Sequence, residues 1–274
     1  MGCESPSLTV PGRWYVRVLF DRLKFLFSST KGLILVAIAL ISLVTAFMGT
    51  LSGPMREWGI TPFVTETFGL QLIPAEREGR ILMLYHTIAV AVVAIETYMI
   101  TELVPMKSHE QRQINATVTL GYLITLVFGL WFGYFGHNFV FHGLYLFGLS
   151  LSFFAGLQLA AALWPWRKAF RVKDRAYAHL GTIDLERAAF FVMAVATLGS
   201  ALLGAVTGSY WGNGHETFLA EDILREPEKA SLQLAIIGHL HIMLTLIAVA
   251  LALIVGRWLD FRGALHKIAM PLFI

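Results

Sequence analysis

The chain alternates between long apolar runs and shorter segments that carry nearly all of its charges. Each long run can cross a hydrocarbon core of about 30 Å as a helix that rises about 1.5 Å per residue. The pattern predicts six transmembrane helices, at residues 33–51, 81–103, 116–136, 141–164, 187–210 and 232–255. A further apolar run begins at Ile268, and the pattern leaves open whether it starts a seventh span. We therefore expect an all-α integral membrane bundle of about six helices.

The charges of the connecting segments predict the orientation of the bundle. Four segments that share one side are basic, and they carry Arg13, Arg17, Arg22, Lys24, Lys31, Lys107, Arg112, Arg167, Lys168, Arg171, Lys173, Arg175, Arg257, Arg262 and Lys267. The other side is acidic, with Glu57, Glu66, Glu76, Glu78, Glu216, Glu221, Asp222, Glu226 and Glu228. Lysine and arginine collect in cytoplasmic loops, so the N-terminus is predicted to be cytoplasmic.

The segment before the first span is basic and amphipathic. Residues 13–27 place Arg17 on one helical face and Phe20 on the other. This pattern predicts a helix lying on the inner leaflet, or an anchor packed against the bundle, and both interpretations stay open. We therefore expect two domains: a cytoplasmic arm at residues 1–32 and a polytopic transmembrane domain at residues 33–274.

Composition excludes a soluble domain and limits the available chemistry. Of the 274 residues, 57% are hydrophobic and 14% are charged, and the mean hydropathy is +0.67. A soluble domain is usually about 25% charged. The single cysteine, Cys3, excludes an intrachain disulfide and a cysteine zinc site. The nine histidines are therefore the main supply of metal ligands.

Five histidines fall within or at the ends of the predicted spans, all toward the outer side. They are His86, His137, His142, His239 and His241. Ionisable groups inside a bilayer are costly and usually functional. A single membrane histidine is most simply a helix–helix hydrogen bond, but five near the same side favour a metal or pigment site.

The motif Gly238-His239-Leu240-His241 separates its two imidazoles. Each residue turns a helix by about 100°, so His239 and His241 point to nearly opposite sides and cannot easily share one metal. A zinc hydrolase, whose paired histidines lie four residues apart, is therefore not indicated. Because His86 and His241 lie at comparable depth on different spans, they are the preferred axial pair for a haem b. No C-x-x-C-H motif is present, so covalent haem is excluded.

Residues Ile237 to His241 resemble the H-x-H helix of the haem–copper oxygen reductase and nitric oxide reductase superfamily. In that family the first histidine binds the active-site haem and the second binds a low-spin haem, whose other ligand comes from the second span. His86 matches that place. The resemblance covers about two helices, and the family's copper-binding histidines, including an adjacent His-His pair, are absent. It therefore implies a low-spin haem site, and it does not imply oxygen or nitric oxide reduction.

Four further residues complete the predicted site. His239 would serve a second haem, or a hydrogen bond if only one haem is bound, and His137 and His142 are further candidates for cofactor binding. Glu96 is the only carboxylate deep in a span, and it is interpreted either as a proton relay or as a hydrogen bond to a neighbouring helix.

The predicted function is electron transfer by a subunit of an oxidoreductase complex, between a quinone pool and an outer-side partner such as a cytochrome c. One or two haems b, and a quinone, are the expected cofactors. The outer segments 52–80 and 211–231 would meet the redox partner, other subunits would surround the helices, and no nucleic acid is expected. The expected location is a bacterial or archaeal cytoplasmic membrane. A transporter or channel, and a pigment-binding or structural subunit, are the alternatives.

Overall fold

The computed structural model describes residues 20, 23–50, 60–70, 77–135, 138–170, 179–211, 230–261 and 263–274. Within these ranges six helices are long and apolar enough to cross a membrane, as the sequence predicts. They are α2 (Thr30–Thr50), α4 (Arg77–Leu103), α5 (Ser108–Phe135), α6 (Phe139–Leu163), α7 (Leu185–Trp211) and α9 (Ala230–Trp258).

Shorter elements connect or follow the long helices. They are α3 (Ile60–Phe68), η2 (Lys168–Phe170), β1 (His179–Leu180), β2 (Ile183–Asp184), α10 (Ala264–Ala269) and η4 (Met270–Phe273). The two strands form a small antiparallel hairpin in which His179 pairs with Asp184, and Gly181 adopts the positive φ that its turn requires.

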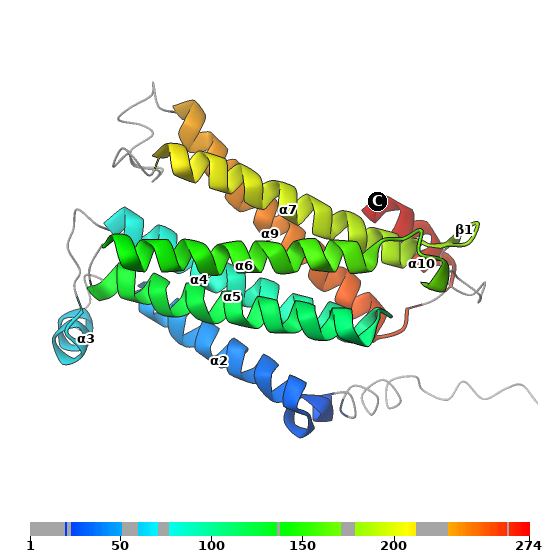
Figure 1. The fold of residues 1–274 in the computed structure, drawn as a ribbon, viewed down its shortest axis with the longest axis horizontal. Helices are drawn as coiled ribbons and strands as arrows, with labels where there is room; N and C mark the ends of the chain where they lie inside the picture. The colour runs from blue at the N-terminus through cyan, green and yellow to red at the C-terminus, as the bar shows by residue number, and fades with distance from the viewer. Residues whose placement is uncertain are drawn as a thin grey trace, which may run out of the picture.

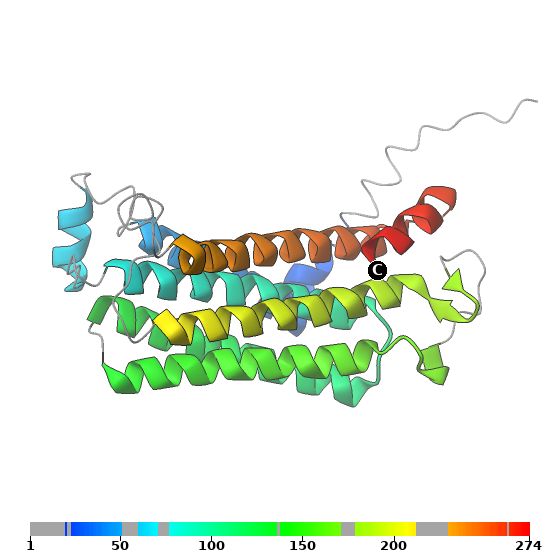
Figure 2. The same cartoon turned by 90° about the horizontal axis from the view of Figure 1, so that it is seen from above.

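Successive long helices run in opposite directions through one bundle (Figure 1). We call the end that carries β1, β2 and α10 the hairpin end, and the opposite end, beside which α3 lies, the α3 end (Figures 1 and 2). The chain therefore alternates between two ends, as a polytopic membrane protein must.

The observed helices differ from the predicted spans in one instructive place. Helix α5 begins at Ser108, eight residues before the predicted start at residue 116. The segment 108–115 is polar, so hydropathy cannot identify it, yet its backbone continues the helix and Asn115 is buried against α4. Polar first turns are thus part of the bundle, and hydropathy alone underestimates the length of this helix.

Two sequence predictions concern the ends of the chain. The apolar run after Ile268 forms part of α10 and η4, which packs on α7 with Met270 buried, so it is not a seventh long helix among the described residues. Most of the predicted N-terminal amphipathic helix lies outside the described residues. Residues 23–28 are helical, and the chain then bends at Ser29 into α2.

Two apolar clusters hold the helices together. One surrounds Phe190 and Leu253 and joins α4, α5, α6, α7, α9 and η4. The other surrounds Tyr122 and joins α2, α4, α5 and α6. Helices α5 and α6 approach most closely through glycine: a Cβ on Gly148 would lie 2.5 Å from the backbone nitrogen of Thr125. Small residues at helix crossings are the usual means of close packing in a membrane.

Arg187, in the first turn of α7, is almost completely buried, with 2% of its surface exposed. Its guanidinium donates to the carbonyl oxygen of Pro105 at 2.7 Å, to that of Trp164 at 3.5 Å, and to that of Ala162. It also lies over the ring of Phe170, 4.3 Å from its centroid. The last carbonyls of a helix have no partner within the helix, so Arg187 caps the end of α6 and ties it to the α4–α5 turn.

We predict that Arg187→Leu lowers the thermal stability of the purified protein. Each buried carbonyl left without a donor costs about 1–3 kcal/mol, so the free energy of unfolding should fall by at least about 2 kcal/mol. Tryptophan fluorescence during heating measures the change. Arg112→Leu, an exposed position on α5, is the matched control and should melt like the wild type. Equal melting of the two variants would contradict the capping role.

Candidate functional site

The hairpin end is closed by ion pairs that each join a different pair of segments. They are Lys31–Glu102 at 2.6 Å between α2 and α4, Arg167–Glu110 at 2.8 Å between the α6–η2 turn and α5, and Arg257–Glu186 at 2.9 Å between α9 and α7. Each pair brings a carboxylate of one segment to a cation of another. The helices are therefore clamped to one another at the hairpin end.

His266 of α10 lies among the charges of the same end. It is largely buried, and that burial lowers the pKa of its imidazole below the ordinary value. The carboxylates of Asp184 and Asp260 act in the opposite direction, while Arg257 reinforces the effect of burial. The imidazole is consequently neutral near pH 7, and it belongs to this polar cap and not to the membrane site.

Toward the α3 end, α7 and α9 separate from the other helices (Figure 1). Helix α9 buries Ala250, Leu253 and Ile254 in its second half, but none of the described side chains from residue 234 to 249 is buried. The part of α9 that carries both histidines is thus held mainly by α7, and it keeps one face open to its surroundings.

His239 faces α7. Its Nδ1 lies 3.2 Å from the hydroxyl oxygen of Ser200. A Cβ on Gly204 would lie 2.5 Å from both Cε1 and Nε2 of the ring, so the imidazole occupies the space that glycine leaves free. In this arrangement both nitrogens are next to α7, and His239 acts as a helix–helix contact.

His241 points to the other side of α9 and is exposed. Its Nδ1 lies 2.8 Å from the carbonyl oxygen of Ile237, one turn earlier. A carbonyl oxygen only accepts hydrogen bonds, so Nδ1 must carry the proton. In the neutral ring Nε2 is then unprotonated and available as a ligand atom. The two histidines of the H-x-H motif therefore diverge, as the helical geometry predicts.

The other predicted ligands lie near the same end of the bundle. His86, on α4, is half-buried with its ring edge-on to that of Tyr145 at 6.4 Å between centroids. His142, on α6, lies against the ring of Phe132 at 5.3 Å. His137 lies outside the described residues. The structure thus brings His86 to α6 and His142 to α5.

Depth along the helices is the property that the preferred pair shares. Helices α4 and α9 both start at the α3 end (Figure 1), and His86 and His241 follow their first residues by nine and eleven positions. Both histidines therefore lie in the half of their helix that is toward the α3 end. The described residues contain no group of three or more His, Cys, Asp and Glu side chains that could hold a metal. The pairing of His86 with His241 stays a prediction.

Glu96 lies in the interior of α4, with 6% of its surface exposed. Its Oε1 is buried, and no hydrogen-bond partner for this atom is found among the described residues. The alternative expectation from the sequence, a hydrogen bond to a neighbouring helix, is thus not seen for this atom. A carboxylate without a partner is expensive in an apolar interior, which makes Glu96 a candidate functional group.

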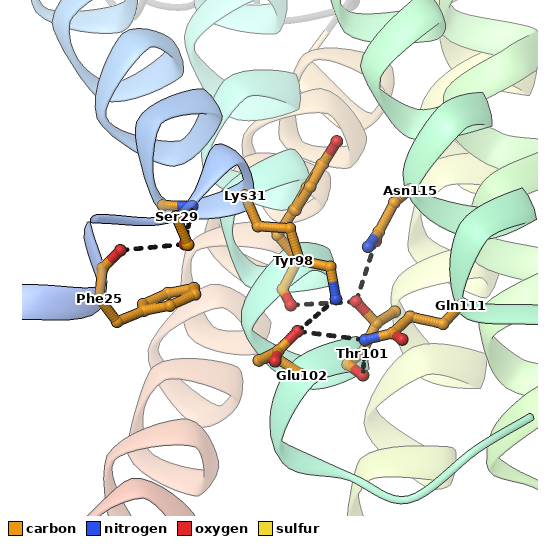
Figure 3. Close-up of polar contacts among 9 residues, drawn as sticks. Phe25, Ser29, Lys31, Tyr98, Thr101, Glu102, Gln111 and Asn115 are labelled. Carbon is orange, nitrogen blue, oxygen red and sulfur yellow. Dashed lines mark hydrogen bonds and ion pairs between the residues drawn. The ribbon is translucent and has the colours of Figure 1, made fainter. Parts of the chain in front are cut away.

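A polar network between α2, α4 and α5 is the feature that the sequence did not reveal (Figure 3). Thr101 donates from its hydroxyl to Asn115 Oδ1 at 2.9 Å, and its carbonyl accepts from Gln111 Nε2 at 2.7 Å. The same amide of Gln111 lies 3.2 Å from Glu102 Oε2, which pairs with Lys31. The only signal in the sequence is the polar character of residues 108–115, ahead of a strongly apolar run.

Comparison with protein-family models, with curated proteins and with solved structures gives no match.

We predict that Gly204→Ala destabilises the α7–α9 contact by displacing the imidazole of His239. Overpacking of this kind costs about 1–3 kcal/mol. The cost should largely disappear in a His239→Ala background, because the clash is with that ring, and thermal melting of the single and double variants measures this coupling. Gly199→Ala, on the same helix but with open space around its Cβ position, should be nearly neutral. Additive effects of Gly204→Ala and His239→Ala would refute the contact.

Proposed function

We propose that this chain is a haem b subunit of a membrane oxidoreductase complex, which passes electrons between a quinone pool and a redox partner. Support comes from the imidazole of His241. It lies on a helix long and apolar enough to cross a membrane, its Nδ1 is bonded to the carbonyl of Ile237, and its Nε2 is therefore the ligand atom of the neutral ring. A ring held in this tautomer by a backbone carbonyl is the usual form of a histidine that ligates a metal.

The residues around His241 fit an apolar macrocycle. Leu244 and Leu234 are exposed on the same part of α9, and the segment has no charged side chain before Arg257. We assign the second axial nitrogen to His86, because of its depth and because it comes from a different helix. Haem held there would supply one-electron redox chemistry. The chain's own contribution is to fix the ring of His241 through Ile237 and to surround the site with aliphatic side chains that exclude water.

His239 has a different role in this proposal. Its contacts with Ser200 and Gly204 favour the interpretation as a hydrogen-bonded packing residue, which applies if one haem is bound. A second haem on His239 would require α7 to move away. One haem b per chain is therefore the stoichiometry that we propose.

Replacement of the ligands tests the proposal. We expect the wild-type protein to show a haem b spectrum, reduced minus oxidised, and a bis-histidine signal in electron paramagnetic resonance. His86→Ala and His241→Ala should each abolish that low-spin signal, because each removes an axial nitrogen. His239→Ala is the matched control and should keep it. A wild-type protein without haem would refute the redox function and leave a transporter or a pigment-binding or structural subunit. Retention of the full signal by both ligand variants would refute only the pairing.

We further propose that the hairpin end faces the cytoplasm of a bacterial or archaeal cell. The described residues at this end include Lys107, Arg112 and Lys168, whereas the described lysines and arginines of the other end are Arg77 and Arg80 at the start of α4. This charge asymmetry follows the positive-inside rule. An outer-side redox protein such as a cytochrome c would then meet the segments 52–80 and 211–231, of which the structure describes residues 60–70, 77–80, 211 and 230–231.

Cysteine labelling of intact cells tests the orientation. In a Cys3→Ser background, we expect Glu66→Cys to react with a membrane-impermeant maleimide from outside, and Lys168→Cys to react only after the cells are opened. Both positions are exposed, so a difference between them reports sidedness and not burial. Labelling of Lys168→Cys in intact cells would show that the hairpin end faces the outside, and it would contradict the proposed orientation.

A further inference from the structure

An apolar stretch of α4 separates Glu96 from the residues of the same helix nearer the α3 end. The eight residues before it, 88–95, are all Ile, Ala or Val, and they span about 12 Å of helix. Val90, Ala91 and Ala94 of this stretch are buried in the apolar cluster around Tyr122. Between Thr87 and Glu96, α4 therefore offers no polar side chain for water or ions to follow.

Between Glu96 and the hairpin end, the same helix carries several polar side chains. Thr97, Tyr98, Thr101 and Glu102 follow Glu96 within two turns, and Thr97 and Thr101 are buried. The hydroxyl of Tyr98 lies 2.7 Å from that of Thr119 on α5. Polar side chains thus follow Glu96 along α4 to its end, and those of Tyr98 and Thr101 meet α5.

These groups connect with the surface (Figure 3). Thr101 bonds to Asn115 and to Gln111, and Gln111 reaches Glu102. Glu102 and its partner Lys31 are each 42% exposed, so this pair forms the solvent-facing end of the network. On α2, α5, α6 and α9, every Asp, Glu, Lys and Arg lies near the hairpin end, so no fixed charge of these helices lies level with Glu96.

We propose that Glu96 is a site of proton exchange, which is reached only from the hairpin end along the polar side chains between α4 and α5. An unpaired carboxylate would be costly at this position, so the carboxyl group is held neutral. The proton it releases passes to hydroxyl groups and water beside Thr97 and Thr101 and leaves near Glu102, and the return of a proton by the same route restores the neutral acid. This inference goes beyond the proposed electron transfer and does not require haem.

Chemical labelling tests whether the neutral acid exists. The apolar carbodiimide DCCD reacts with protonated carboxyl groups inside membranes. We expect DCCD to label Glu96 in the full-length protein in lipid vesicles, and Glu96→Gln to abolish this labelling. Infrared spectroscopy should show a protonated carboxyl band that is lost in the same variant. Absence of both the label and the band in the wild type would overturn the proposal, whether or not the protein contains haem.

The rate at which deuterium replaces the carboxyl proton of Glu96 tests the route. In deuterium oxide, the shift of the infrared band measures this rate. Thr101→Val should slow the exchange about tenfold, because a hydroxyl within hydrogen-bond distance of the Tyr98 carbonyl and of Asn115 is replaced by a methyl group. Thr87→Val is the matched control, since Thr87 is equally buried on α4 but lies beyond the aliphatic stretch. It should leave the rate unchanged.

A second variant keeps the route testable if Thr101→Val folds poorly. Asn115→Leu leaves Thr101 its bond to the Tyr98 carbonyl and should also slow the exchange. Slowing by Thr87→Val, or unchanged rates in both Thr101→Val and Asn115→Leu, would overturn access from the hairpin end.

Discussion

A buried arginine at the start of α7 sets the geometry of the bundle. The guanidinium of Arg187 donates hydrogen bonds to carbonyl groups at the end of α6 and in the α4–α5 turn. This one side chain therefore joins the start of α7 to both of these segments. In a membrane, helix ends have few other partners, and unsatisfied carbonyls are costly. The planar, many-donor group of arginine suits this task, and lysine would offer fewer fixed donors. The positions of α6 and α7, and through them that of α9, depend on this contact.

The helices are held together more firmly at the hairpin end than at the α3 end. Among the described residues, the hairpin end has three ion pairs between different segments, and the larger apolar cluster lies beside it. At the α3 end, the part of α9 before Ala250 buries none of its described side chains. The histidines lie in this second region, and the polar network lies in the first. The proposed electron site and the proposed proton route therefore lie in opposite halves of one bundle.

Much of the fold could be predicted because it follows from the order of apolar and polar residues along the chain. Six apolar runs predict six helices, and the turn of about 100° per residue predicts that His239 and His241 diverge. The rest depends on contacts between distant residues. No periodicity indicates that Arg187 reaches Pro105, or that Thr101 meets Asn115 across two helices. Hydropathy likewise misplaced the start of α5, since buried polar residues resemble a loop until their partners are known.

The exposed half of α9 makes the surroundings of His241 depend on the lipid or protein beside it. A segment with so little burial can open locally while the clamped end stays folded. Detergent that replaces the native neighbours would thus disturb this half of the helix first. Total helicity would barely change, although the imidazole had lost its environment. For this protein, helical content and the integrity of the α9 site are separate measures of a good preparation.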